Sequence, residues 1–257
     1  MAWEHEVVAF NTATESTNRM HDDTVAATYG FRGGLVPGVD VWAYLTRPCV
    51  DRWGAEFLER GTMEARFLLP VYDGERVTCR LDDDGTLVAV GPDGGVRAQG
   101  RAALADDLPV VHDLPVAPVP DPVPPAAAEL LAPGTALGTL RFHHRQEPAR
   151  QYLDDVREDS PLYEAGAIAH PGFLARQANY VLSSSVRLGP WIHVSTRAQH
   201  RGAVRDGELL EVRGRVADER EHKGHRFVDL DVEITADGRP VWSAFHTAIW
   251  QPRRDRA

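Results

Sequence analysis

The sequence has little cysteine, no excess of positive charge and no long apolar run. Its two cysteines, Cys49 and Cys79, are too few for a disulfide framework and lack zinc-ligand spacing, so we expect a reducing, cytoplasmic compartment. The net charge of −10 argues against nucleic-acid binding, which needs a basic surface. No apolar stretch could span a bilayer, and the acidic N-terminus does not resemble a signal peptide. We therefore expect neither a nucleic-acid nor a membrane partner.

Proline, in contrast, is abundant near the middle of the 257 residues. Proline fixes φ and lacks a backbone donor, so a dense cluster cannot form a helix or an inner strand. We interpret residues 108–135 as an extended, semi-rigid connector. This divides the chain into an N-terminal unit, 1–107, and a C-terminal unit, 136–257. The prolines are Pro109, Pro115, Pro118, Pro120, Pro122, Pro124, Pro125 and Pro133.

The two units share an order of turns. Asp73-Gly74 in the first corresponds to Asp206-Gly207 in the second, and Asp93-Gly94 corresponds to Asp237-Gly238. Asp-Gly pairs favour tight turns because glycine tolerates positive φ. The matching order indicates a duplication, with hairpins at the second pair of turns.

Each unit is predicted to consist of a helix followed by antiparallel strands. Apolar residues over 39–53 and 173–182 predict one helix per unit. Alternating residues over 211–216 and 227–234 predict half-buried antiparallel strands, and 241–250 continues the meander. Trp191, Trp242 and Trp250 are predicted core or interface residues. The fold class is therefore α+β, with each unit a sheet wrapped around one helix.

The segment from Asn18 to Gly38 carries the chemistry. Asn18, His21, Ala27, Gly30-Phe31 and Gly38 stand at nearly the spacing of a motif of MaoC-like proteins, the R-specific enoyl-CoA hydratases and acyl dehydratases. The sequence resembles that family well over this motif and more loosely over both units. The resemblance implies a tandem, or double, hot-dog fold, and an acyl thioester of CoA or an acyl carrier protein as substrate.

The resemblance also implies roles for these residues. His21 would be the acid–base group, since a histidine pKa lies close to neutrality. Asn18 would orient water or the thioester. The Gly38 N–H, in the first turn of the predicted helix, would stabilise negative charge on the thioester oxygen. A glycine at this position would also let the substrate approach the backbone closely. Neighbouring residues are expected to contact the substrate, namely Tyr29, Phe31, Val36 and Pro37.

The chain departs from the family motif at two positions. The family's catalytic aspartate falls on Ser16 and its proline on Arg19. A serine cannot act as a base at neutral pH, so a nearby carboxylate would have to substitute. Glu15, Asp22 and Asp23 are the candidates, and we predict Asp23 as part of the catalytic set. The alternative is that Asp22 and Asp23 only favour the start of a short helix, 23–29.

The second unit has its own version of the motif, without the histidine. Glu158-Asp159-Ser160-Pro161-Leu162-Tyr163 places Tyr163 where His21 stands in the first unit, and His170-Pro171 precedes the helix. We expect the first unit to be active and the second to be a degenerate, structural partner.

Three functions remain open on this fold. The leading hypothesis is a hydratase or dehydratase of 2-enoyl or 3-hydroxyacyl thioesters, which needs no cofactor or metal. A thioesterase or a cyclase would keep the fold and change the chemistry. A non-catalytic acyl-thioester-binding protein, or a partner subunit, would fit the missing aspartate. A homodimer of the double unit and a monomer that is already a pseudo-dimer are equally compatible with the sequence.

Overall fold

The computed structural model describes residues 2–108 and 113–253. Residues 109–112 of the proline-rich segment, and the last four residues of the second unit, lie outside these ranges.

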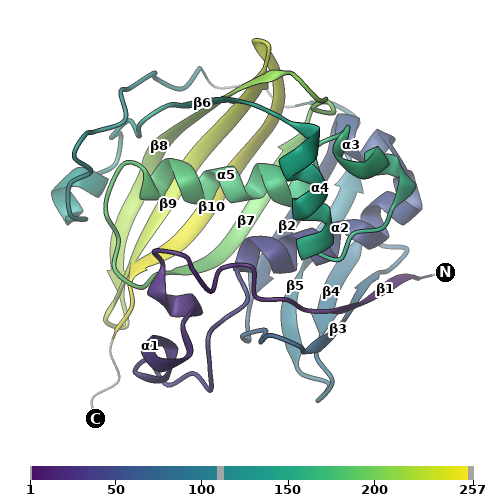
Figure 1. Ribbon diagram of the computed structural model, residues 1–257, viewed down its shortest axis with the longest axis horizontal. Coiled ribbons are helices and arrows are strands. Elements are labelled where there is room, and N and C mark those ends of the chain that lie inside the picture. The colour runs from purple at the N-terminus through teal and green to yellow at the C-terminus, as the bar shows by residue number, and fades with distance from the viewer. Residues whose placement is uncertain (1, 109–112, 254–257) are drawn as a thin grey trace.

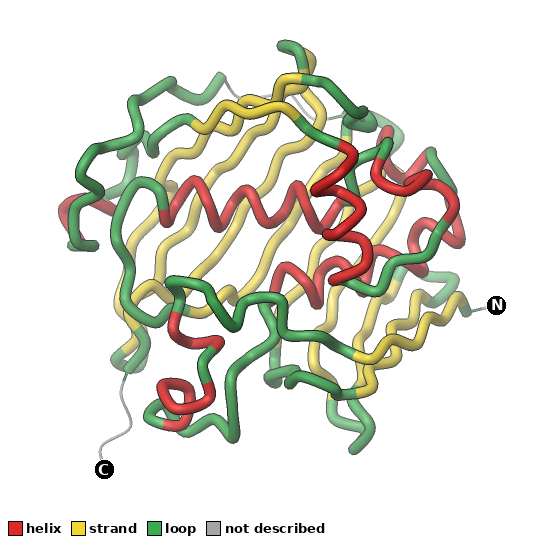
Figure 2. The backbone as a smooth tube through the Cα atoms, in the orientation of Figure 1, coloured by secondary structure: helices red, strands yellow, loops and turns green. Residues whose placement is uncertain are grey.

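The described strands form one ten-stranded antiparallel sheet, continuous across both units (Figure 2). Its order is β1-β3-β4-β5-β2-β7-β10-β9-β8-β6. Counted outward from the central β2–β7 pair, each half repeats the same connectivity, which supports the predicted duplication. The strands are β1 (Trp3–Val8), β2 (Gly61–Phe67), β3 (Arg76–Leu81), β4 (Thr86–Val90), β5 (Val96–Leu104), β6 (Leu140–His143), β7 (Ile192–His200), β8 (Leu209–His222), β9 (His225–Ala236) and β10 (Arg239–Gln251).

Two helices lie on one face of this sheet, one per half (Figure 1). They are α2 (Gly38–Trp53) and α5 (Pro171–Ser183), which confirms the two predicted helices. Helix α5 begins earlier than predicted because Pro171 suits a first turn and the His170 ring caps the Gly172 N–H at 2.9 Å. Shorter helices are α1 (Asp23–Ala27), α3 (Glu56–Arg60) and α4 (Gln146–Asp155), with 3-10 turns η1 (Arg19–His21), η2 (Ala128–Leu131) and η3 (Pro161–Gly166).

The predicted strands and turns of the second unit are also confirmed. β8, β9 and β10 contain the three expected ranges. The β9–β10 hairpin turns at Asp237-Gly238, where both residues have positive φ, 48° and 78°. This is the conformation for which Asp-Gly is favoured in two-residue hairpins.

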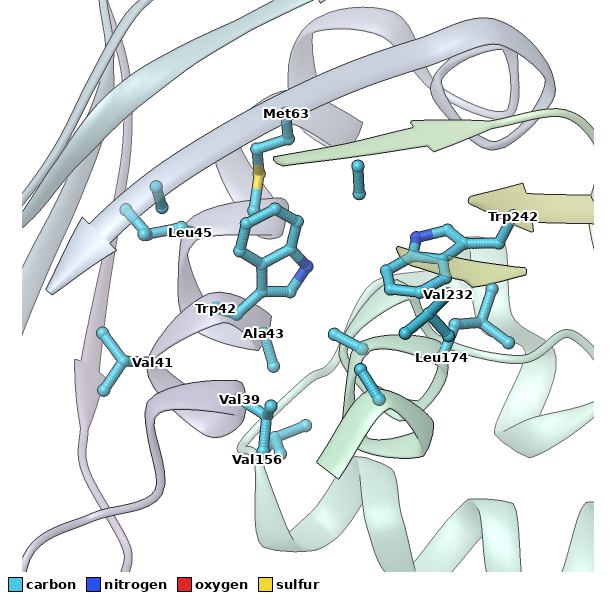
Figure 3. Close-up of a cluster of buried hydrophobic side chains, with 14 of the residues drawn as sticks. Val39, Val41, Trp42, Ala43, Leu45, Met63, Val156, Leu174, Val232 and Trp242 are labelled. Carbon is cyan, nitrogen blue, oxygen red and sulfur yellow. The ribbon is translucent and has the colours of Figure 1, made fainter. Parts of the chain in front are cut away.

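A single hydrophobic core joins the two halves under the helices. Trp42 of α2 lies beside Met63 of β2, and Trp242 of β10 lies near Leu174 of α5 (Figure 3). Trp191, Trp242 and Trp250 are all buried, as predicted. Because side chains of both halves fill one core, the two units pack against each other and do not form two independent domains.

The described part of the proline-rich segment packs on the second half. Leu114 is buried, and its carbonyl accepts a 2.9 Å hydrogen bond from Arg213 of β8. Ala126 N–H donates to the Arg187 carbonyl at 3.0 Å. Apart from the short 3-10 turn η2, residues 113–135 form no helix and no extended strand, in line with the proline content. The exact domain boundaries stay a prediction.

A buried ion pair holds the two helices together. Asp40 of α2 is fully buried and pairs with Arg176 of α5 at 2.6 Å, and it accepts a second hydrogen bond from Thr12 at 2.6 Å. A buried charge that loses its partner is strongly destabilising, whereas exposed pairs contribute little.

We therefore expect Asp40→Ala to lower the free energy of unfolding by about 3–5 kcal/mol, because it leaves the Arg176 guanidinium without its anion. Urea unfolding of the purified variant measures this. Arg19→Ala, which breaks the exposed Arg19–Asp22 pair, is the control and should cost less than about 1 kcal/mol. Equal costs would show that the buried pair has no special weight.

Candidate functional site

A pocket of about 220 Å³ opens between the two halves. The first half contributes the segment from Asn18 to Val41 and the end of β2. The second half contributes Asn179 of α5, the start of β7 and Ile249 of β10. Most of the lining is apolar, including Phe31, Val36, Val41, Phe67, Leu68, Leu69, Ile192 and Ile249. Such a pocket suits an acyl chain, with a few polar groups to orient it.

Asn18 ties this segment to the second half. Its Oδ1 accepts hydrogen bonds from Met20 N–H (3.2 Å) and Trp191 N–H (3.1 Å), and its Nδ2 donates to the Trp191 carbonyl (3.0 Å). The second Nδ2 proton faces His21. The amide is therefore fully engaged with protein groups. Asn18 therefore holds the loop and the His21 ring in place. Its predicted contact with water or thioester stays a prediction.

His21 is held in one tautomer by the Leu35 carbonyl, and its ring lines the pocket. Its Nδ1 lies 2.7 Å from the Leu35 carbonyl, which can only accept, so Nδ1 carries the proton. Nε2 therefore has the lone pair, and it accepts a longer, 3.2 Å hydrogen bond from Asn18. Burial lowers the pKa of His21, against smaller opposing effects of the Leu35 carbonyl and Asp40. At neutral pH the ring is thus a neutral base.

Gly38 begins α2 at the pocket, as predicted. Among the described residues, its N–H donates no hydrogen bond, as expected for the first turn of a helix. The reason for glycine differs from our expectation of a close approach by substrate. A Cβ at this position would lie 2.8 Å from His193 Nδ1, so the glycine makes room for a histidine ring.

The carboxylates of Asp22 and Asp23, next to His21 in the sequence, accept hydrogen bonds from backbone N–H groups of the surrounding loop. Asp22 caps α1 by accepting from Val25 N–H at 3.0 Å. Asp23 accepts from Gly34 N–H at 2.7 Å and lines a separate surface hollow. The Asp22 cap matches the alternative in which the residue favours a helix start, whereas the Asp23 carboxylate joins the first turn of α1 to Gly34. Among the described residues, no Asp or Glu lines the apolar pocket between the two halves, whereas His21 also lines the surface hollow that contains Asp22 and Asp23.

Three of the four predicted substrate-contact residues line the pocket, namely Phe31, Val36 and Pro37. Tyr29 does not. It packs against the small buried cluster of Met20, Ala26 and Leu35, where it supports the loop from behind.

The sequence analysis missed the polar groups that the second half brings to the pocket. Asn179 and His193 both line it, and each has a buried atom without a hydrogen-bond partner among the described residues, Asn179 Oδ1 and His193 Nδ1. No motif spacing could have indicated them, because they lie about 160 and 170 positions from His21 in the sequence.

The corresponding region of the second half is filled. Tyr163, which stands where His21 does, is fully buried, and its ring lies 4.7 Å from that of His170. His170 Nε2 lies 3.3 Å from Glu158, which also pairs with Arg47. Burial works to raise the pKa of Glu158, but the hydrogen bonds and charges of His170, Ser160 and Arg47 lower it to about 2. This burial suits the structural role predicted for the second unit.

Metal clusters and membrane-spanning helices were sought in the residues that the structure describes. Within residues 2–108 and 113–253, no three His, Cys, Asp or Glu side chains come together as metal ligands would. Among the helices of the same ranges, none is long and apolar enough to cross a bilayer.

Comparison with known proteins places the fold. Neither a family model nor a curated protein matches the sequence, but solved structures do. A MaoC domain dehydratase, so described, from Chloroflexus aurantiacus shares 13% identity and a TM-score of 0.64, with 98% of this chain and 95% of that chain covered. A conserved hypothetical protein from Mycobacterium tuberculosis, described as a double hot-dog, shares 14% identity and a TM-score of 0.64, with 97% and 95% covered.

A third structure, described as an oleoyl thioesterase, from Lactobacillus plantarum, has 12% identity and a TM-score of 0.53, and each chain is 98% covered. The chain therefore has the double hot-dog fold found in MaoC-like dehydratases, and the predicted resemblance is confirmed at the level of the fold. Because dehydratases and thioesterases share this fold, the fold alone does not distinguish the two reactions.

Proposed function

We propose that this protein is a hydratase or dehydratase that interconverts 2-enoyl and 3-hydroxyacyl thioesters. The observation that carries the proposal is the pairing of two groups at one apolar pocket. His21 presents a neutral Nε2 lone pair, and Gly38 presents an N–H at the start of a 16-residue helix. A base and an anion-stabilising donor are what removal of an α-proton from a thioester requires.

The reaction can proceed with His21 as the single acid–base residue. In the dehydration direction, Nε2 takes a proton from C2, and the Gly38 N–H stabilises the enolate-like charge on the thioester oxygen. The electron pair then forms the C2–C3 double bond as the C3–O bond breaks. The protonated His21 returns the same proton to the departing hydroxyl, which leaves as water. No second carboxylate is required, which agrees with the lining of the pocket.

A second candidate is an acyl-thioester-binding protein without turnover. It is favoured by the same absence of carboxylates among the described residues that line the pocket, because Ser16 stands where the motif has its aspartate. Its Oγ accepts a 3.1 Å hydrogen bond from Asn18 N–H and so has a local structural role.

We expect the purified protein to consume 2-enoyl-CoA thioesters, because His21 supplies the base that hydration needs. Loss of the enoyl absorbance is followed with acyl chains of increasing length, with release of free thiol measured in parallel. Loss of absorbance without thiol supports the proposal. Thiol release would indicate a thioesterase. No loss of absorbance and no thiol release, together with thermal stabilisation by acyl-CoA, would favour the acyl-thioester-binding protein.

A further inference from the structure

A groove of about 460 Å³ lies beside α5 and shares no lining residue with the pocket between the two halves. It is bordered by β6, α4 and α5, which lie together in the second half (Figure 1). Asn179 of α5 lines the pocket between the halves, whereas another face of the same helix lines the groove, through Phe173, Gln177, Tyr180 and Ser184. The groove has roughly twice the volume of that pocket, about 220 Å³, and its size is typical of a small-molecule site.

The floor of the groove is aromatic. The Phe173 ring of α5 meets the Phe142 ring of β6 edge to face, with centroids 6.2 Å apart, and lies 5.5 Å from the His144 ring. The His144 ring is fixed in turn, because its Nε2 lies 3.2 Å from the Gly166 carbonyl. Tyr180 forms part of the wall, with 47% of its surface exposed. Apolar surface that stays open to water in a concave region is typical of a binding groove.

The rim of the groove is cationic. Arg141 and Arg145, both exposed, line it together with His143, and within residues 2–108 and 113–253 no Asp or Glu does so. Arg141 already pairs with Glu211 at 2.6 Å. The Arg145 guanidinium has no ion-pair or hydrogen-bond partner among the described residues. In a chain whose net charge is −10, this rim has the opposite sign and presents the Arg145 guanidinium to an anion.

We propose that this groove binds a free fatty carboxylate, with its hydrocarbon tail on the aromatic floor and its carboxylate against Arg145. The apolar floor excludes a small, fully hydrated anion, because the loss of its hydration there has no compensation. The guanidinium favours a carboxylate, whose two oxygens match its paired N–H donors. The ligand class goes beyond the proposed function, since it is the free acid and not the thioester, and the groove is separate from the proposed catalytic pocket.

The test compares two amphiphiles with nearly the same tail and opposite charge. Binding of decanoate and of decyltrimethylammonium to the wild-type protein is measured by calorimetry, below the concentrations at which either forms micelles. Non-specific attraction to a chain of net charge −10 favours the cation, so a preference for the anion has to come from a local site. We expect decanoate to bind at least about fivefold more tightly. Arg145→Ala should remove this preference, and Tyr180→Ala should weaken the binding of decanoate by about threefold through lost apolar contact.

Arg187→Ala is the matched control, because Arg187 is an exposed arginine of the second half that lines neither the groove nor the pocket between the halves. It should leave both affinities unchanged. Equal or tighter binding of the cation, or no detectable binding of decanoate, would overturn the inference. So would a decanoate affinity that is the same in Arg145→Ala and Tyr180→Ala as in the wild type, which would indicate the pocket between the halves instead. Because Arg145 and Tyr180 are exposed, both variants should fold, and thermal unfolding checks this. The test measures binding without turnover, so the proposed function can hold or fail independently.

Discussion

Replacing His21 with alanine is expected to lower kcat/KM for a 2-enoyl thioester by at least about 100-fold, the usual contribution of a positioned acid–base group. The substitution removes the lone pair at Nε2 that the proposed reaction needs. It also removes the hydrogen bond to the Leu35 carbonyl, so thermal unfolding has to be measured alongside the rate. A variant that remains folded but has lost turnover identifies His21 as the base.

The pH profile provides an independent readout of the same residue. Burial lowers the pKa of His21, so the neutral base persists below the ordinary histidine pKa of about 6.5. The acidic limb of kcat/KM should therefore have its midpoint below pH 6.5. His143→Ala is the matched control, since His143 is an exposed histidine of β6 outside the pocket, and it should change neither the rate nor the limb. Unchanged turnover in folded His21→Ala would contradict the proposed role.

The sequence predicted those parts of the fold that depend on local pattern. The apolar residues of β9 alternate over 227–234 and are buried as that pattern predicts. Asp229 and Glu233 on the other face are buried as well, which the alternation does not predict. Asp237-Gly238 forms its hairpin because a tight turn needs positive φ at both residues. The repeated order of such signals was sufficient to predict the duplication and the α+β class.

The site was predicted only on the side that one continuous segment supplies. His21, Gly38, Phe31, Val36 and Pro37 belong to that segment, and all of them line the pocket. The opposite wall comes from α5 and β7. The pairing of β2 with β7 and the packing of α5 against α2 bring those elements to the first half. No local pattern encodes a contact between residues that are more than 100 positions apart.

The roles of individual polar residues were harder still to predict. Asp23 is near His21 in sequence, yet its carboxylate accepts from the Gly34 N–H. Gly38 was expected to admit substrate, whereas its hydrogen side chain faces the His193 ring. In each case the partner of the residue is set by tertiary packing, which a local sequence pattern does not encode.

The three buried histidines of the second half's sheet should make the protein strongly sensitive to acid. Burial lowers the pKa of His200 and of His246 to about 3 and that of His193 well below its ordinary value. In the unfolded chain each would titrate near 6.5. Below that pH the unfolded state binds more protons than the folded state, so the free energy of unfolding falls as the pH falls. Each histidine contributes a slope of about 1.4 kcal/mol per pH unit.

Between pH 5.5 and 4.5, before most carboxylates titrate, these three residues should together give a slope of about 4 kcal/mol per pH unit. His5, His21 and His144 also have a lowered pKa because of burial and would add to it. Urea unfolding at several pH values measures the slope. His246→Phe should reduce it by about 1.4 kcal/mol per pH unit, whereas His222→Phe, at an exposed position of β8, should not change it. A slope near zero would mean that these rings become protonated in the folded protein in spite of their burial.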